Sequence, residues 1–174
     1  MIDFKTLYAK TKDLSLLLVE DYEPLLNDMA EVMEDLFETV VVASNGVEAL
    51  ALYDDYMKKK GKTFDIVMAD IVMPYMDGVV LSEILRKRNE SQRIIILSAH
   101  TDSEYLLKLI NLGISQFINK PIQQTQVFET LYTVSEKLEH KTEEPRESVI
   151  VNLKKGMIWD KEKEVLFRES DPVA

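Results

Sequence analysis

Polar side chains follow four short apolar runs of this sequence, and their types suggest chemistry. They are Glu20 and Asp21 after the first run, Asp70 after the third, Ser98 at the end of the fourth and Lys120 after the fifth. If these runs end at one edge of a fold, their carboxylates repel one another unless a cation lies between them. Mg²⁺ suits such a site, because it binds through a few carboxylates, water and phosphoryl oxygens. The residue types therefore suggest an acidic pocket that handles phosphate.

Each of these residues also has a purely structural interpretation when it is taken alone. Asp70 and the Glu20–Asp21 pair are about equally well explained as caps of the helices that follow them. Ser98 alone fits an ordinary strand end, and Lys120 alone fits a surface lysine. The structural interpretations together require a coincidence at every one of these positions, so the set as a whole favours a functional site.

Five apolar runs must position these side chains, over residues 14–19, 40–43, 64–69, 94–98 and 116–119. Each is followed by a segment with apolar residues at helical spacing, as in Leu25, Met29 and Val32. Continuous apolar strands are typical of a parallel sheet that is buried on both faces. Right-handed crossovers then predict an α/β fold, a five-stranded parallel doubly wound (flavodoxin-like) sheet with helices on both faces. Ligands of such sheets lie beyond the carboxyl ends of the strands, where the polar residues fall.

The composition limits the classes of partner. The 174 residues carry a formal net charge of −10 and have a pI of about 4.8, which argues against a basic nucleic-acid surface. No apolar run reaches the roughly eighteen residues that a membrane-spanning helix needs. Cysteine is absent, so neither a disulfide framework nor a thiolate metal site is expected. No secretory signal is evident, and we expect a cytoplasmic location without a membrane partner.

The chain is predicted to have four segments: an extension over residues 1–13, the sheet domain over 14–141, a polar linker over 142–148 and a short β segment over 149–174. In the last segment, residues 149–153 are strand-like, and 156–160 and 164–168 could pair as a hairpin around 161–163. A β segment this short is marginal alone. That favours a piece of a longer protein over a terminal interaction element.

The polar residues lie in motifs that resemble the receiver domain of two-component response regulators. The matching segments are Leu16-Leu17-Leu18-Val19-Glu20-Asp21, Asp65-Ile66-Val67-Met68-Ala69-Asp70-Ile71-Val72-Met73-Pro74-Tyr75-Met76-Asp77-Gly78, Leu97-Ser98-Ala99-His100 and Asn119-Lys120-Pro121-Ile122. The resemblance covers about residues 14–141, and the motifs are jointly specific.

The resemblance implies a role for each matching position. Asp70 would be the phosphoacceptor, and Asp21, assisted by Glu20, would bind Mg²⁺ together with Asp70 and the backbone carbonyl of Val72. Lys120 would pair with a phosphoryl oxygen. Ser98 and Phe117 would form the switch: the Ser98 hydroxyl moves to bond the phosphoryl group, and Phe117 turns inward.

The resemblance also implies a signalling function. A sensor histidine kinase would phosphorylate Asp70 and so change the surface formed by the fourth helix, fifth strand and fifth helix of the receiver. That surface would control a partner or an output domain, with transcription as one candidate output. The chain would be no enzyme beyond its own phosphorylation and dephosphorylation.

The last segment, residues 149–174, resembles the opening strands of an OmpR-like winged-helix output domain. On this resemblance it would be the truncated remnant of such a domain. DNA binding is then expected only if a missing C-terminal winged-helix domain exists in the full protein. One departure weakens this resemblance. Receivers of that class carry acidic residues near the fifth strand and arginines in the last helix, whereas this chain has Ser115 and Gln116, then Lys137 and Lys141. Whether the protein forms a homodimer is therefore left open by the sequence.

Three other classes compete with this interpretation. A haloacid-dehalogenase-type phosphatase also uses a strand-end aspartate and Mg²⁺, but it needs a second aspartate where this chain has Val72. A dinucleotide-binding domain needs a glycine-rich turn after the first strand, whereas this turn begins Glu20-Asp21. A receiver that has lost phosphorylation and serves as a scaffold is the third alternative, and the complete acidic set argues against it.

Overall fold

A parallel sheet of five strands forms the centre of the first part of the chain. The computed structural model describes residues 1–99, 103–114, 116–142, 150–153, 157–160 and 165–168. The strands are β1 (Ser15–Val19), β2 (Thr39–Ala43), β3 (Ile66–Asp70), β4 (Arg93–Ser98) and β5 (Gln116–Asn119), in the order β2-β1-β3-β4-β5. Every neighbouring pair is parallel. The predicted α/β fold is therefore confirmed, and the carboxyl ends of all five strands lie at one edge.

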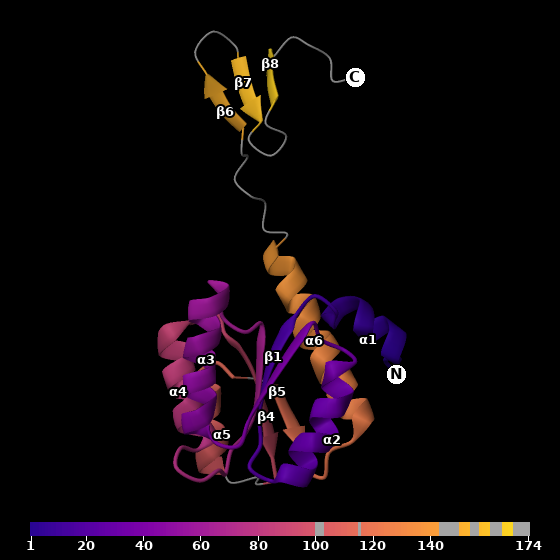
Figure 1. Cartoon of the computed structure of the whole chain (residues 1–174), viewed down its shortest axis with the longest axis vertical. Coiled ribbons are helices and arrows are strands. Elements are labelled where there is room, and N and C mark those ends of the chain that lie inside the picture. Colours follow the sequence, from indigo (N-terminus) through magenta and orange to yellow (C-terminus); the bar gives the residue numbers. More distant parts are fainter. Residues whose placement is uncertain (100–102, 115, 143–149, 154–156, 161–164, 169–174) are drawn as a thin grey trace. The chain divides into compact units, whose positions relative to one another are not determined.

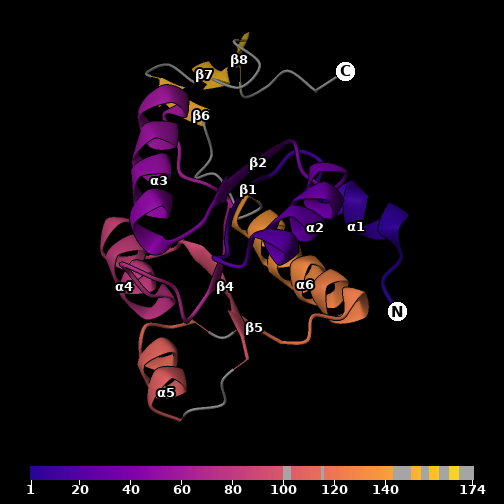
Figure 2. The same cartoon turned by 60° about the horizontal axis from the view of Figure 1, so that its bottom comes forward.

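Six helices cover the two faces of this sheet (Figures 1 and 2). Helices α3 (Gly46–Lys60), α4 (Gly78–Arg88) and α5 (Ser103–Asn111) lie on one face, and α1 (Phe4–Thr11), α2 (Glu23–Glu34) and α6 (Gln124–Thr142) lie on the other. The strand side chains alternate between two cores. Leu17 and Val19 belong to the core beneath α3 and α4, whereas Leu16 and Leu18 belong to the core beneath α2 and α6. This is why the β1 run is apolar throughout.

Local signals fix the ends of the helices. Asn45 caps α3, because its side chain accepts a hydrogen bond from the Glu48 N–H, and Asp77 caps α4 by accepting one from the Val80 N–H. Helix α3 ends at Gly61, whose φ of 69° is the left-handed conformation that glycine adopts without a Cβ clash. Helix α4 thus begins just after the loop that follows Asp70.

Residues 1–13, expected only as an extension, contain a helix packed on the second core. The Asp3 side chain caps α1 by accepting a hydrogen bond from the Thr6 N–H at 2.7 Å. Leu7 is fully buried, and the Thr11 hydroxyl donates to the Leu36 carbonyl at 2.8 Å. Helix α1 is therefore a structural part of the same unit as the sheet.

The chain divides into two compact units, residues 1–138 and 139–174. In the second, β6 (Ile150–Leu153), β7 (Met157–Asp160) and β8 (Val165–Arg168) form an antiparallel sheet in the order β6-β7-β8. These strands fall within residues 149–174, for which a short β segment was predicted, and the predicted turn at 161–163 lies outside the described residues. No described helix is both long enough and apolar enough to cross a membrane.

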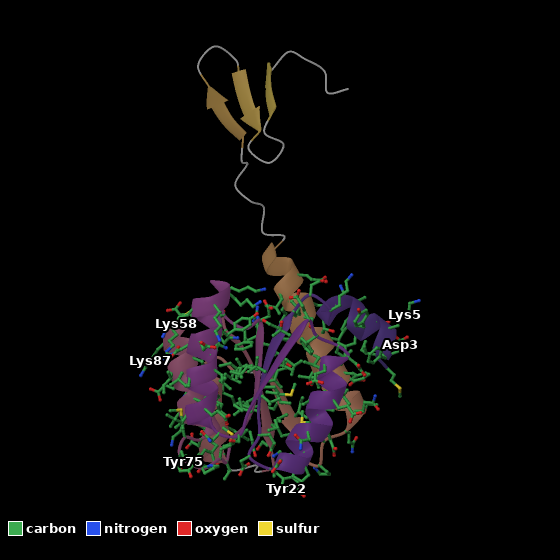
Figure 3. The ribbon with its side chains drawn as sticks, viewed as in Figure 1. Asp3, Lys5, Tyr22, Lys58, Tyr75 and Lys87 are labelled. Carbon is green, nitrogen blue, oxygen red and sulfur yellow. The ribbon has the colours of Figure 1, made fainter. Side chains whose placement is uncertain are left out.

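We expect Leu7→Ala to lower the free energy of unfolding by about 2–5 kcal/mol, because it leaves a cavity beneath α1. The matched control is Lys5→Ala on the same helix, whose exposed side chain points outward (Figure 3), with an expected change within about 0.5 kcal/mol. Urea denaturation measures both. Equal small effects would show that α1 contributes nothing to the core.

Candidate functional site

Three carboxylates meet at the carboxyl edge of the sheet. Glu20 follows β1 and is fully buried, Asp70 ends β3 and is 8% exposed, and Asp21 is exposed. One carboxylate oxygen from each lies within 4.8 Å of the others. The parallel register explains this convergence, since Val19 pairs with Ala69 and places the two strand ends side by side. A hard divalent cation such as Mg²⁺ fits this all-oxygen set.

Lys120 links two of these carboxylates. Its Nζ donates to Glu20 Oε2 at 2.7 Å and to Asp70 Oδ2 at 2.8 Å. The lysine follows β5, its backbone N–H donates to the Ser98 carbonyl at 2.9 Å, and its peptide bond to Pro121 is cis. The structure therefore brings together Glu20, Asp21, Asp70 and Lys120, all of which the sequence singled out.

Burial and pairing act in opposite directions on the charges of this site. Burial raises the pKa of Glu20, a hydrogen bond from Lys120 lowers it, and the nearby charge of Asp70 raises it, for a net increase. Burial lowers the pKa of Lys120, but hydrogen bonds to Asp70 and Glu20 raise it by more, so the net shift is upward. The lysine therefore carries its positive charge. A further cation placed beside Glu20 would stabilise the charged form of that carboxylate.

The loop after Asp70 folds back closely onto the strand that precedes it. The Gly78 N–H donates to the Ile71 carbonyl at 2.7 Å, and a Cβ on Gly78 would lie only 2.1 Å from the Asp70 carbonyl oxygen. A Cβ on Gly46 would lie 2.6 Å from the Met76 carbonyl oxygen. These two close approaches hold the loop in place. Nothing in the sequence indicated the contact between Gly46 and Met76.

The remaining predicted site residues lie around this cluster. Val72 is 49% exposed in the loop after β3, and Ser98 is buried at the end of β4, where it pairs in register with Asn119. Phe117 is partly buried and packs against the core beneath α3 and α4. Ser98 and Phe117 thus occupy adjacent strands, as a coupled pair would require, and their switching roles stay predictions.

Tyr75 is a feature of this loop that the sequence did not single out. Its φ is 67°, an uncommon backbone conformation for a tyrosine, and its side chain is 90% exposed. Tyr22, 63% exposed, lies at the same end of the unit (Figure 3). Two accessible aromatic rings therefore border the acidic edge.

The geometry agrees with what comparison to known proteins shows. Residues 16–132 match the family model described as the response regulator receiver domain, and the chain belongs to that family. Its relatives include the chemotaxis protein CheY of Halobacterium salinarum, 33% identical over 118 residues, which are 68% of this chain and 93% of that protein. The CheY of Listeria monocytogenes is 36% identical over 120 residues, or 68% and 95% of the two chains.

Solved structures confirm the fold. The non-phosphorylated receiver domain of HemR from Leptospira biflexa has 28% identity and a TM-score of 0.62, covering 71% of this chain and 94% of that one. CheY in the CheX–CheY complex from Borrelia burgdorferi has 24% identity and a TM-score of 0.63, covering 73% and 92%. Residues 16–132 thus form a receiver domain with a CheY-like fold.

The raised pKa of Glu20 predicts how stability depends on pH when a chelator removes metal. The folded state binds more protons than the unfolded state between the ordinary pKa of 4.5 and the raised value, so stability falls as the pH rises through that interval. We expect Glu20→Gln to raise the urea midpoint at neutral pH, and this gain to vanish below pH 4.5.

The control for this prediction is Glu48→Gln, a change of the same type at an exposed helix position. Hydrogen bonds from the Ser44 hydroxyl and N–H lower the pKa of Glu48, so its carboxylate stabilises the fold at neutral pH, and its replacement should give no gain. An equal gain from both variants would point to net charge alone and contradict the assignment to burial of Glu20.

Proposed function

We propose that this receiver is a phosphorylation switch in which Asp70 accepts a phosphoryl group from a phosphohistidine of a sensor histidine kinase. The observation that carries the proposal is the contact of Lys120 Nζ with both Asp70 and Glu20, within a cluster of three carboxylates. Similarity to the sensor kinase CckA of Brucella abortus, 33% over 132 residues that form 14% of that protein, supports a link to kinases.

Each residue has a chemical task in this proposal. One oxygen of the Asp70 carboxylate attacks phosphorus, an O–P bond forms, and the P–N bond to the donor imidazole breaks as that imidazole leaves. Lys120 pairs with a phosphoryl oxygen and offsets charge that is otherwise concentrated on Asp70 and the donor.

A metal ion completes the set. Glu20, Asp21 and Asp70 would hold Mg²⁺ with the backbone carbonyl of Val72, and the bound ion would screen the negative charges that must approach one another. The exposure of the two neighbouring acids suits a site in which Asp21 binds the ion and Glu20 assists, because Asp21 is accessible to solvent whereas Glu20 is buried. The protein would catalyse only its own phosphorylation and dephosphorylation.

The new phosphoryl charge would then act on the switch. The Ser98 hydroxyl would donate to a phosphoryl oxygen, Phe117 would turn inward, and the surface of α5, β5 and α6 would change. These are the fourth helix, fifth strand and fifth helix predicted from the sequence, renumbered because α1 precedes them. Leu107 and Ile110 on α5 are 59% and 57% exposed, an apolar surface that a partner could bind.

The output belongs to the same proposal. We place the switch in the cytoplasm, where a kinase can supply phosphoryl groups, with transcription as the candidate output. The antiparallel β6-β7-β8 sheet is compatible with the start of an OmpR-like output domain, and DNA binding would need a further winged-helix domain. The proposal includes a homodimer as a candidate active form.

The proposal predicts phosphorylation of the protein at one residue. On incubation with acetyl phosphate, we expect a mass gain of one phosphoryl group that requires Mg²⁺ and is absent from Asp70→Asn. The control is Asp28→Asn, an exposed aspartate on α2, which should be modified like the wild type. Intact-mass spectrometry makes the measurement. Modification of Asp70→Asn at the wild-type level would refute the assignment.

A separate prediction concerns the metal. Asp21→Asn should weaken Mg²⁺ binding by about tenfold or more, because it removes the accessible carboxylate of the set. Amide chemical shifts in a Mg²⁺ titration give the affinity. Glu23→Gln, which changes an exposed carboxylate in the first turn of α2, is the control and should bind like the wild type. Equal weakening by both variants would indicate that Mg²⁺ is attracted only by the general negative charge and not by a specific ligand.

A further inference from the structure

A second cluster of charged side chains lies at the opposite edge of the sheet, where strands β4 and β5 begin. Arg93 is the first residue of β4, Arg86 lies near the end of α4, and Lys137 is on α6. These residues line a small pocket, with a cavity of about 30 Å³, together with Ile94, Gly113, Ile114, Gln116 and Val134. The pocket thus draws on four elements of the unit and has no residue in common with the acidic site.

Two guanidinium nitrogens of this pocket are buried without a hydrogen-bond acceptor. The Nε atoms of Arg86 and Arg93 have no partner among the described residues. Arg86 is held in place by its other nitrogens, since Nη1 donates to the Glu90 carbonyl and Nη2 to the Gly113 carbonyl at 3.1 Å. A buried charged donor without an acceptor is destabilising, because it has lost its hydrogen bonds to water without replacement. Such a group in a native fold calls for an acceptor from outside the chain.

The charges of the pocket are also uncompensated. Its lining contains three cations and no carboxylate, and no ion pair of the described residues includes Arg86, Arg93 or Lys137. Burial lowers the pKa of Arg86, and the charge of Arg93 lowers it further. The two arginines therefore repel each other at close range, and an anion between them would relieve the repulsion.

Further cations lie at the C-terminal ends of α3 and α4, although the chain as a whole is acidic. Lys58, Lys59 and Lys60 end α3, and Lys87 and Arg88 end α4. Lys58 and Lys87 lie away from Tyr22 and Tyr75, which border the acidic edge (Figure 3). Three of these five cations already have carboxylate partners, because Lys59 pairs with Asp55, Lys87 with Glu83 and Arg88 with Asp54. The neighbouring acids are thus engaged elsewhere.

We propose that the pocket of Arg86, Arg93 and Lys137 binds a phosphate group, either as the free ion or at the end of a small phosphomonoester. The cavity is small, about 30 Å³, which favours a compact anionic group over an extended ligand. Guanidinium N–H groups bind phosphate oxygens well, and three donors suit a tetrahedral dianion better than the two oxygens of a carboxylate. The bound group would join α4, β4 and α6.

The test is a titration of the full chain with inorganic phosphate, in chelator at constant ionic strength, followed by ¹H–¹⁵N spectra. We expect saturable shifts of the Arg86 and Arg93 Nε–H signals and of the Ile94 and Gly113 amides, with a Kd of about 1–10 mM. Acetate and chloride should give no saturation. Linear shifts, or equal shifts with chloride, would overturn the proposal, because they indicate general charge screening.

Variants separate the pocket from the surrounding positive field. Arg93→Gln should weaken phosphate binding by about tenfold or more, and the exposed Lys137→Gln, which leaves the core intact, should weaken it by about threefold or more. The matched control is Arg88→Gln on α4, which should bind as the wild type does. Equal weakening by Arg88→Gln, or wild-type binding by both pocket variants, would refute the site.

Glycerol phosphate distinguishes the two sources of the phosphate group. Binding as tight as that of inorganic phosphate would support a phosphomonoester, and binding of inorganic phosphate alone would support the free ion. Failure of both would overturn the proposal. The outcome does not depend on phosphorylation of Asp70, since the titration contains neither Mg²⁺ nor a phosphoryl donor.

Discussion

The crowding of negative charge at the carboxyl edge of the sheet is the constraint on which the functional part of this molecule depends. Glu20 and Asp70 are both buried there, and Lys120 contacts the two carboxylates at 2.7 and 2.8 Å. Burial raises the pKa of Glu20, and the hydrogen bond from Lys120 opposes that increase, so the lysine keeps the pair compatible with burial. The parallel register brings these groups to the same edge from strands that lie far apart in the sequence.

Backbone packing supports this electrostatic arrangement. The loop after β3 approaches Asp70 so closely that a side chain at position 78 has no room, and the start of α3 approaches Met76 in the same way. Both contacts place backbone against backbone, which flexible side chains cannot absorb. The acidic edge is therefore held by rigid elements, while Val72 and Tyr75 in the loop remain exposed to a partner.

Much of this arrangement could be predicted from the sequence because the relevant signals are local. Buried parallel strands give continuous apolar runs, and the ends of those runs identify Glu20, Asp70 and Lys120 without knowledge of the topology. Contacts between distant segments leave no such signal. The packing of Leu7 beneath α1 and the meeting of Arg86 with Arg93 and Lys137 become visible only once the chain is folded. Movement of Ser98 and Phe117 requires a second conformation, which one structure cannot supply.

The distribution of aromatic residues gives the two units separate optical signals. The single tryptophan, Trp159, belongs to β7 in the second unit, whereas all seven tyrosines precede residue 139. Tryptophan emission therefore originates in the second unit and tyrosine absorbance in the receiver, with Tyr22 and Tyr75 exposed at the end of the unit that holds the acidic edge. Unfolding of each unit, and any coupling between them, can be followed in the unmodified chain without an added fluorophore.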